Sequence, residues 1–361
     1  MPLAATPDTR RASPCLQASP ADREAPAAPT DDKQWLKILA RYRDPDPVRS
    51  IYELVITAVP FFALWAVMLL GLSYGCWLSL ILAVPAAGFL VRLFMIQHDC
   101  GHGSFFRKPL VNHWVGRAIG VLTLTPYDCW RRSHAVHHAT SGNLDRRGTG
   151  DVTTLTVTEY LSLPRWRRLG YRLLRNPLIL LALGPIYLFL LKHRLPVELM
   201  DSGKEVWISA MATNLAIAGV VVGMSSLIGI QSFLLVQLPI TLLASSIGIW
   251  LFYVQHQFEH TYWDHQDDWS FHSGAMQGST FFDLPAPLRW FTANIGVHHV
   301  HHLASRIPSY RLGEVLRDHP KLREVSRLTL RDSFRCFRLA LWDEEQRRLV
   351  GFRDLRAPAA A

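Results

Sequence analysis

Four apolar stretches, each close to the length of a membrane-spanning helix, constrain this chain of 361 residues most strongly. About 20 consecutive apolar residues are needed to cross a bilayer as a helix, because a spanning segment must satisfy its own backbone polar groups. The sequence therefore predicts an all-α integral membrane protein with four transmembrane helices arranged as two hairpins. The stretches cover residues 53–72, 77–96, 206–228 and 232–254.

The rest of the chain predicts three regions. Residues 1–32 are rich in Ala, Pro, Thr and Asp and show no signal-peptide pattern, which indicates a disordered N-terminal tail. We expect the membrane domain to span residues 33–330, with interfacial helices and a cytoplasmic cap, and residues 331–361 to form a cytoplasmic C-terminal segment. Within the domain, residues 33–49 favour a surface helix. The weaker apolar stretch 177–191, interrupted by a Gly-Pro pair, favours an interfacial or re-entrant segment.

The positive charges predict the orientation in the membrane. Lys and Arg are absent between Arg49 and Arg92 and again between Lys204 and Arg289, so both short hairpin turns are free of positive charge. Cytoplasmic loops carry the excess of Lys and Arg. We therefore expect both turns on the non-cytoplasmic side, and both termini and every histidine cluster on the cytoplasmic side, with a bacterial inner membrane as the expected location.

The overall charge indicates which classes of binding partner to expect. A formal net charge of +9 favours contact with anionic lipid headgroups or an acidic protein. Nucleic acid is not expected as a partner, since no recognisable nucleic-acid module accompanies the basic residues. Five cysteines without a CxxC pair indicate a reducing compartment. We expect three basic side chains beside the apolar stretches to extend to the lipid headgroups: Arg92, Lys192 and Arg194.

Eight histidines at HxxxH or HxxHH spacing lie in three clusters beside the apolar stretches: HDCGH at 98–102, HAVHH at 134–138 and HHVHH at 298–302, the last of which also contains His299. Histidines three or four residues apart share one face of a helix. The end of the fourth apolar stretch adds two more, again four residues apart. The candidate metal ligands are therefore ten: His98, His102, His134, His137, His138, His256, His260, His298, His301 and His302.

The number of histidines narrows the choice of metal. Neutral imidazole binds zinc, iron, copper and nickel, so ligand type alone does not identify the ion. A zinc site takes three or four protein ligands, and a larger set favours two ions of higher coordination. Iron in such a pair can activate dioxygen, which side chains alone cannot do. Charged imidazoles so close together would repel one another, which also favours neutral, metal-bound rings.

Other residues have supporting roles at most. A carboxylate or carbonyl partner is needed to orient each metal-binding imidazole, and five carboxylates are near enough in sequence: Asp99, Asp145, Asp151, Glu259 and Asp283. The histidines without such context are assigned to loops, interfaces or supporting contacts: His113, His193, His265, His272 and His319.

The clusters and the residues around them resemble the membrane fatty acid desaturase family, specifically its delta-12 (omega-6) acyl-lipid branch and the related omega-3 enzymes. The resemblance covers roughly residues 33–330. The segments that carry it are HDCGHGSFF at 98–106, WRRSHAVHHATSGNLDRR at 130–147, FYVQHQFEHTYW at 252–263 and NIGVHHVHHLASRIPSYRL at 294–312.

This resemblance implies a non-haem enzyme with two iron ions and dioxygen as co-substrate. Among the candidate ligands, His256 matches the additional histidine that precedes the last cluster, His260 lies at a position that varies in the family, and His299 fills a spacer position outside the ligand set. The short HxxxH of the first cluster favours an acyl group esterified to a membrane glycerolipid. A fused haem motif is absent from the sequence, which implies a separate electron donor, either a ferredoxin or a b-type cytochrome.

The expected activity is the introduction of a cis double bond into such an acyl chain, at the delta-12 position (oleoyl to linoleoyl). A related di-iron hydroxylase or oxygenase acting on acyl chains, alkanes or carotenoids would carry the same clusters. A zinc membrane hydrolase or a metal transporter is less favoured. HExxH is absent, and the clusters lie at helix ends rather than near the membrane midplane, where a transporter places its ligands.

Overall fold

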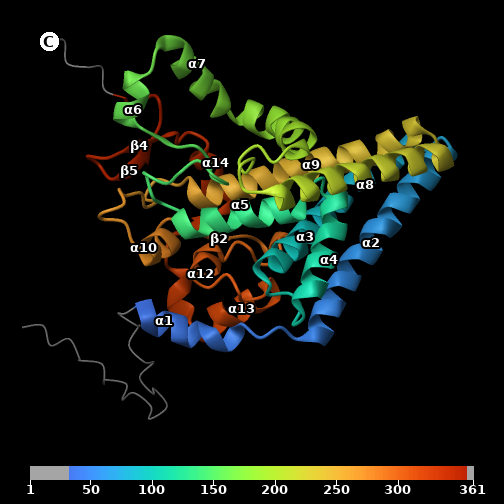
Figure 1. Cartoon of the computed structure of the whole chain (residues 1–361), viewed down its shortest axis with the longest axis horizontal. Helices are drawn as coiled ribbons and strands as arrows, with labels where there is room; N and C mark the ends of the chain where they lie inside the picture. Colours follow the sequence, from blue (N-terminus) through green and yellow to red (C-terminus); the bar gives the residue numbers. More distant parts are fainter. Residues whose placement is uncertain (1–31, 356–361) are drawn as a thin grey trace, which may run out of the picture.

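The structure is a computed structural model in which residues 32–355 are described (Figure 1). The predicted tail at residues 1–32 lies, apart from its last residue, outside the described residues. Four long helices dominate the fold, which confirms the all-α prediction. They are α2 (Pro47–Ser73), α3 (Ala83–His102), α8 (Lys204–Ile228) and α9 (Ile230–His256).

Shorter elements complete the chain. The other α-helices are α1 (Asp32–Leu39), α4 (Pro109–Leu122), α5 (Tyr127–Thr140), α6 (Val157–Ser162), α7 (Arg165–Leu174), α10 (Phe271–Met276), α11 (Ala286–Phe291), α12 (His298–Leu303), α13 (Ser309–Asp318) and α14 (Leu330–Cys336). The 3-10 helices are η1 (Ala40–Tyr42), η2 (Trp77–Leu82), η5 (Lys192–Arg194) and η6 (Pro320–Arg323), and the π-helices are η3 (Ile179–Leu183) and η4 (Ile186–Leu191). The strands are β1 (Leu155–Thr156), β2 (Phe281–Asp283), β3 (Arg327–Thr329), β4 (Leu341–Asp343) and β5 (Arg348–Val350).

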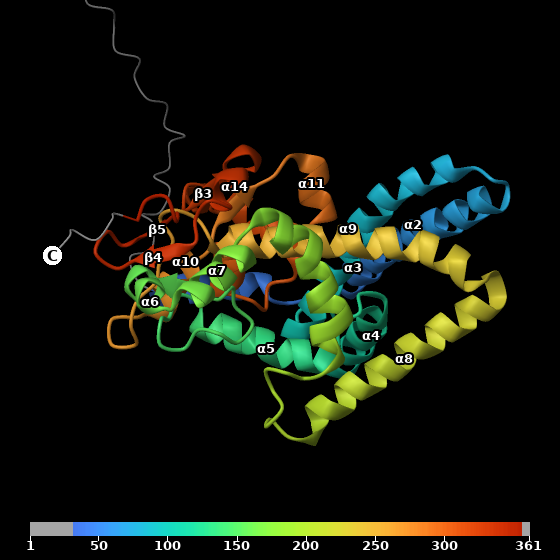
Figure 2. The same cartoon turned by 90° about the horizontal axis from the view of Figure 1, so that it is seen from above.

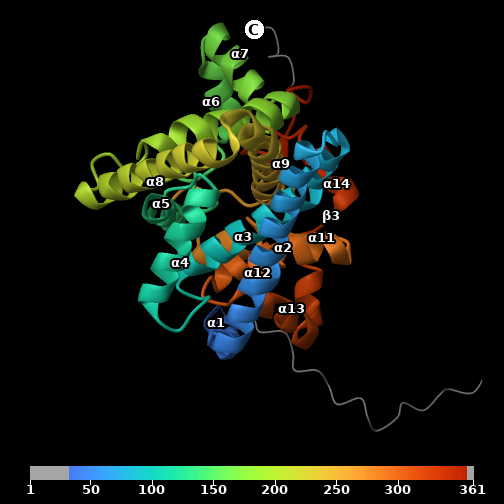
Figure 3. The same cartoon turned by 90° about the vertical axis from the view of Figure 1, so that its right-hand side faces the viewer.

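The two predicted hairpins are present. Four helical segments are long and apolar enough to cross a membrane, the second being η2 and α3 together. Figures 1 and 2 show that α2–α3 and α8–α9 extend toward the same end of the molecule, away from the short helices and strands, and Figure 3 views the molecule from that end. Only 17% of the apolar windows of α2 and α8 is buried inside the protein, so most of their surface is available to lipid.

Local sequence explains where these helices begin and end. Asp46 caps α2, because its side chain accepts hydrogen bonds from the backbone N–H groups of Val48 and Arg49, and Pro47 occupies the first helical position. Helix α3 ends at His102 and is capped by Gly103, which adopts a left-handed conformation (φ 66°). Helix α9 ends at His256.

Helix α3 forms the centre of the bundle, since it contacts α2, α4 and α9 more extensively than other helices do. Small side chains at Ala83, Ala86 and Ala87 are fully buried there and allow neighbouring backbones to approach closely. Tyr127 anchors α5 beneath α3 by donating a hydrogen bond to the Cys100 carbonyl at 2.8 Å. Together these contacts fix the histidine-bearing ends of the helices relative to one another.

The prediction that Arg92 reaches lipid headgroups is wrong. Arg92 is buried in the protein and forms an ion pair with Glu53 of α2, which is also buried. It also donates hydrogen bonds to Thr57 Oγ1 and to the Trp290 carbonyl. The other two basic residues of that prediction also have protein partners: Lys192 pairs with Glu198, and Arg194 donates to Asn214 and to a backbone carbonyl.

The remaining elements form the cap at the other end of the molecule. Strands β1, β4 and β5 make one small sheet, and β2 and β3 pair in parallel in another. Trp35 and Leu39 of α1 pack with Ile307 and Leu312 in a separate apolar core, so α1 is bound to α13. The weaker apolar stretch forms a helical unit bent by 66° relative to α7. That geometry is consistent with a re-entrant or broken span.

Candidate metal centre

Nine histidines come together on four helices, α3, α5, α9 and α12. Figure 1 shows where these four helices lie in the molecule. The regular spacing within each cluster holds in the structure, because each cluster is helical and its imidazoles share one face. Helix α3 contributes His98 and His102, α5 contributes His134, His137 and His138, α9 contributes His256, and α12 contributes His298, His301 and His302.

The nine side chains form two groups, in each of which the ligand atoms lie within 4.8 Å of one another. The groups adjoin, since the rings of His138 and His302 stack at a centroid distance of 4.1 Å. The first group is His98, His102, His134, His138 and His301, and the second is His137, His256, His298 and His302. Each of the three sequence clusters supplies at least one ring to the first group.

In the second group, hydrogen bonds at the Nδ1 atoms of two rings define which ring nitrogen carries the hydrogen. His256 Nδ1 lies 3.1 Å from the Gly278 carbonyl oxygen, and His137 Nδ1 contacts the Asp151 carboxylate. Both oxygens are acceptors, so each Nδ1 carries the hydrogen and each Nε2 has a free lone pair. The two Nε2 atoms face each other at 3.2 Å, and His298 Nε2 lies 3.0 Å from His256 Nε2.

This arrangement fits metal binding. Lone pairs that face one another at this distance repel unless a cation lies between them. A metal–nitrogen distance of about 2.1 Å places two nitrogens at right angles about 3.0 Å apart. The first group repeats the spacing, with His138 Nε2 at 3.1 Å from both His134 Nε2 and His301 Nε2. His102 Nε2 is buried without a hydrogen-bond partner, as are both ring nitrogens of His302.

The electrostatics favour neutral rings. Burial, reinforced by repulsion from neighbouring imidazoles, holds the pKa of five histidines outside the spanning helices well below the ordinary value, because desolvation penalises the charged ring. At neutral pH these side chains therefore keep a lone pair for a metal ion. They are His134, His138, His298, His301 and His302.

The tenth candidate, His260, does not join either group. Helix α9 ends at His256, so the four-residue spacing no longer places His260 on the same helical face, and its side chain is exposed. His299 is buried beside the centre, where burial lowers its pKa to about 4, but it also lies outside both groups. The five histidines assigned to other roles lie outside them as well: His113, His193, His265, His272 and His319.

Two of the five candidate carboxylates contact the centre. Asp151 contacts His137, while Asp99 Oδ1 lies 3.3 Å from His98 Nδ1 and its other oxygen accepts from the Ser309 backbone N–H at 2.7 Å. The other three take part in ion pairs elsewhere: Asp145 with His265, Glu259 with Arg348, and Asp283 with Arg327.

Sequence reasoning missed two residues that support the centre. The Trp130 ring stacks on His134 at a centroid distance of 4.5 Å, and its position one helical turn earlier could have indicated this contact. Arg175 is buried at the end of α7 and donates hydrogen bonds to Tyr253, Gln257 and the Thr153 carbonyl. It thereby ties the loop of Asp151 to the end of α9. No local sequence pattern indicates the long-range contacts of Arg175.

A small cavity adjoins the second group. Its volume is about 10 Å³, and His137, His256 and Asp151 contribute to its wall. This is roughly the room that one water-sized molecule requires. Phe252 and Val152 make the rest of the wall partly apolar. The cavity therefore provides a small compartment against two of the candidate ligands.

Comparison with known proteins identifies the family. A family model described as fatty acid desaturase matches residues 74–333. A fatty acid desaturase of Bacillus subtilis is 45% identical over 324 residues, which is 90% of this chain and 92% of that protein. An sn-1 acyl-lipid omega-3 desaturase (ferredoxin) of Synechocystis is 30% identical over 239 residues, 61% of each protein. An endoplasmic reticulum omega-3 fatty acid desaturase of Vigna radiata is 29% identical over 269 residues, 68% of this chain and 65% of that protein. The chain, a membrane protein with four apolar helices above a histidine centre, belongs to the fatty acid desaturase family.

Proposed function

We propose that this protein is an acyl-lipid desaturase that uses two iron ions and dioxygen to introduce a cis double bond into the acyl chain of a membrane glycerolipid. The observation that carries the proposal is the pair of histidine groups, one half-buried and one fully buried, whose facing lone pairs fit two metal ions. Desaturation of a saturated carbon pair by dioxygen needs redox-active metal, because side chains alone cannot activate dioxygen.

The proposed ligands follow the two groups. One iron is held by His98, His102, His134, His138 and His301, and the other by His137, His256, His298 and His302. His260 is left out because it is exposed and distant from the helical face of His256. Asp151 and the Gly278 carbonyl hold the tautomers of His137 and His256.

The proposed desaturation has a fixed balance of electrons and protons. Bound iron would supply the activation of dioxygen and the removal of two hydrogens from adjacent methylenes. Dioxygen takes up four electrons, two from the carbon–hydrogen bonds and two from an external donor, and with two further protons yields two water molecules. The chain's own residues keep the imidazoles neutral by burial and exclude bulk water from the centre.

The substrate and donor remain proposals that the relatives support. The Synechocystis relative is named as an acyl-lipid desaturase that uses ferredoxin, so we propose a glycerolipid-bound acyl chain and a separate donor, ferredoxin or a b-type cytochrome. Delta-12 regiochemistry, oleoyl to linoleoyl, rests on the resemblance of the histidine segments. The charge-free hairpin turns support an inner-membrane orientation with both termini in the cytoplasm.

Expression in a host rich in oleoyl lipids, followed by analysis of its fatty acids, tests this function. We expect a new diene with its second double bond at the delta-12 position, dependent on oxygen. A new double bond elsewhere would contradict the regiochemistry alone. Hydroxylated acyl chains without a new double bond would contradict desaturation and favour the oxygenase alternative.

A further inference from the structure

A second, larger cavity lies beside the start of α2 and the end of α3 and is lined by arginines. Its volume is about 560 Å³, within the usual range for a small-ligand site. Arg43, Arg107 and Arg306 line it together with a single acidic residue, Asp44. The wall therefore has an excess of positive charge, which favours an anionic ligand.

The three guanidinium groups are available to such a ligand. Within residues 32–355, the structure pairs none of them with a carboxylate. Arg107 uses only its Nε, which donates to the Pro45 carbonyl at 3.2 Å, and the buried Nε of Arg43 has no hydrogen-bond partner. A buried donor without a partner costs free energy, and a hydrogen bond to an acceptor offsets that cost. Three guanidinium groups also match the oxygens of a phosphate.

The backbone around the cavity is held in place. Phe106 donates its backbone N–H to the Asn112 side chain at 2.9 Å, and its carbonyl accepts from the same side chain at 2.7 Å. Ser50 of α2 donates to the Phe105 carbonyl. Space also opens at Gly103, where an added Cβ would have no neighbour within 4 Å. The cavity is therefore a preformed feature between the start of α2 and the end of α3.

Its position lies at the boundary of the membrane-spanning region. Pro45 lies two residues before the first residue of α2, and Gly103 directly follows the last residue of α3. On either side, α2 and α4 present exposed apolar residues, including Ile51 and Trp114. The apolar tails of an anionic ligand bound in this cavity would therefore lie beside lipid-facing helices. A soluble anion would make no use of these surfaces.

We propose that this arginine pocket binds the phosphate headgroup of a membrane glycerophospholipid, the carrier of the acyl chain that is desaturated. The assignment of the bound lipid as the substrate rests on the proposed function. Gly103 follows the proposed ligand His102, and Arg306 lies four residues after His302, so the pocket shares two chain segments with the metal centre. Binding of the headgroup here would hold the lipid at the centre while its acyl chain reaches the metals.

A binding experiment on the full-length protein tests the pocket without relying on activity. The probes are short-chain phosphatidylglycerol and a short-chain diglucosyl glycerolipid without phosphate, measured by native mass spectrometry in neutral detergent. We expect the natural protein to prefer the phospholipid by about tenfold or more. Arg43→Gln/Arg107→Gln/Arg306→Gln should lose that preference. Arg317→Gln/Lys321→Gln/Arg323→Gln removes the same charge from exposed positions outside the pocket and should keep it.

Two further measurements make the result decisive. The double variant Arg107→Gln/Arg306→Gln leaves the partly buried Arg43 intact, and an unchanged metal content would show that it folds. In an assay with saturating donor, both pocket variants should raise KM for phospholipid by about tenfold and leave kcat within about twofold. Equal binding of the two lipids, or no effect of the pocket variants, would overturn the proposal.

The outcomes also separate this proposal from others. A raised KM for the reduced donor, with lipid binding unchanged, would make the pocket a docking site for an acidic protein and would contradict a headgroup site. A natural protein that binds phospholipid selectively but forms no double bond would refute the proposed function, while the headgroup site would stand as a lipid site.

Discussion

The Nε2 atoms of His137 and His256 lie 3.2 Å apart in the buried centre, although the Nδ1 atom of each ring is already committed to an acceptor. Neither Nε2 then carries a hydrogen for the other, and the two lone pairs face each other in an interior that screens their repulsion poorly. A cation between them turns this repulsion into binding. The contact joins α5 to α9, so the metal and the fold depend on each other.

Substitution of His256 tests its proposed role as a ligand. His256→Ala removes one of four nitrogens from the second group, and we expect bound iron to fall from about two to about one per chain and double-bond formation to be lost. His260→Ala is the matched control, since its exposed ring lies outside both groups. Metal analysis of the purified variants measures the difference. Loss of iron in His260→Ala would contradict the ligand set.

Removal of the Asp151 carboxylate should weaken metal binding without removing a ligand. Asp151→Ala deprives His137 of the acceptor that fixes its tautomer, and such outer contacts affect metal affinity by about 10–100-fold. Competition with a chelator measures the effect. Asp145→Ala removes a carboxylate that pairs with His265 on the surface and should leave affinity unchanged. Equal metal affinities of Asp151→Ala and Asp145→Ala would argue against a role of the contact between Asp151 and His137 in metal binding.

The buried pair of Glu53 and Arg92 should stabilise the hairpin α2–α3 only as a pair. Glu53→Leu leaves the Arg92 guanidinium buried without its carboxylate, and we expect a cost of about 3–5 kcal/mol in the free energy of unfolding. Glu53→Leu/Arg92→Met removes both charges and should be less destabilised than the single variant. Arg49→Gln alters the exposed end of the network and should cost less than about 1 kcal/mol. Unfolding in detergent measures all three.

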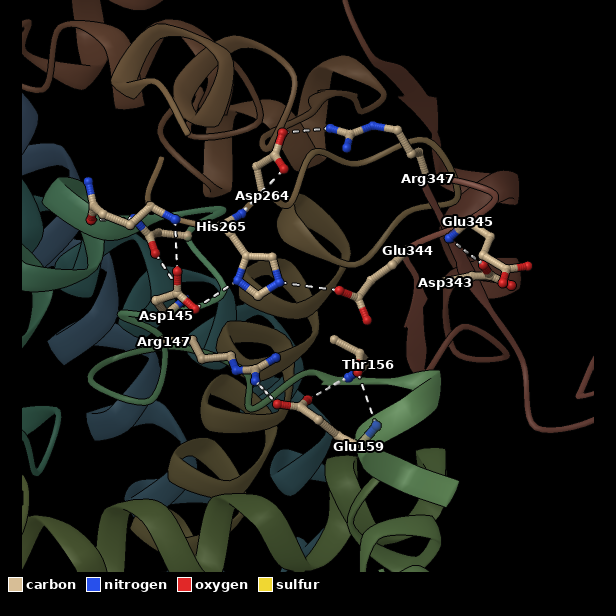
Figure 4. A network of polar contacts seen from close by, with 12 residues as sticks. Asp145, Arg147, Thr156, Glu159, Asp264, His265, Asp343, Glu344, Glu345 and Arg347 are labelled. Carbon is tan, nitrogen blue, oxygen red and sulfur yellow. Dashed lines mark hydrogen bonds and ion pairs between the residues drawn. The ribbon is translucent and has the colours of Figure 1, made fainter. Parts of the chain in front are cut away.

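The surface network around His265 should make stability depend on pH (Figure 4). His265 contacts Asp145 Oδ1 at 2.8 Å and Glu344 Oε1 at 3.2 Å, and these hydrogen bonds raise its pKa above the ordinary value. A raised folded-state pKa means that the stabilisation is complete below the unfolded-state pKa and is lost as pH rises through the folded-state pKa.

The variant His265→Gln tests the direction of this pH dependence. We expect the natural protein to have a higher thermal midpoint than the variant near pH 5.5, and the difference to shrink toward about pH 8.5. Arg347 and Asp264 form a separate ion pair nearby, which the substitution leaves in place. A difference that grows with pH would contradict the hydrogen-bond assignment.

Much of the site could be predicted because its information is local. The spacing of His98 and His102, and of His298, His301 and His302, places rings on one helical face wherever the segment is helical. The same spacing rule wrongly grouped His260 with His256. Helix α9 ends at His256, and the length of the apolar stretch does not determine where that helix ends. Four apolar stretches likewise defined the two hairpins, with boundaries that differ from those of the structure by at most six residues.

Long-range partners could not be predicted. The sequence shows Arg92 at the end of an apolar stretch, but its partner Glu53 lies on another helix and is buried only after the two helices pack. In the same way, Asp145 is nearer to the second cluster in sequence than Asp151, and only the path of the loop brings Asp151 to His137. Arg175 depends on two separate segments, the end of α9 and the loop at Thr153, for these hydrogen bonds.

The most direct test of the central claim is the metal content of the full-length protein, measured together with its conversion of an acyl lipid. The two histidine groups predict about two iron ions per chain and desaturation that requires dioxygen and a reduced donor. A protein that is fully active with a single ion, or with zinc and no reductant, would contradict the account.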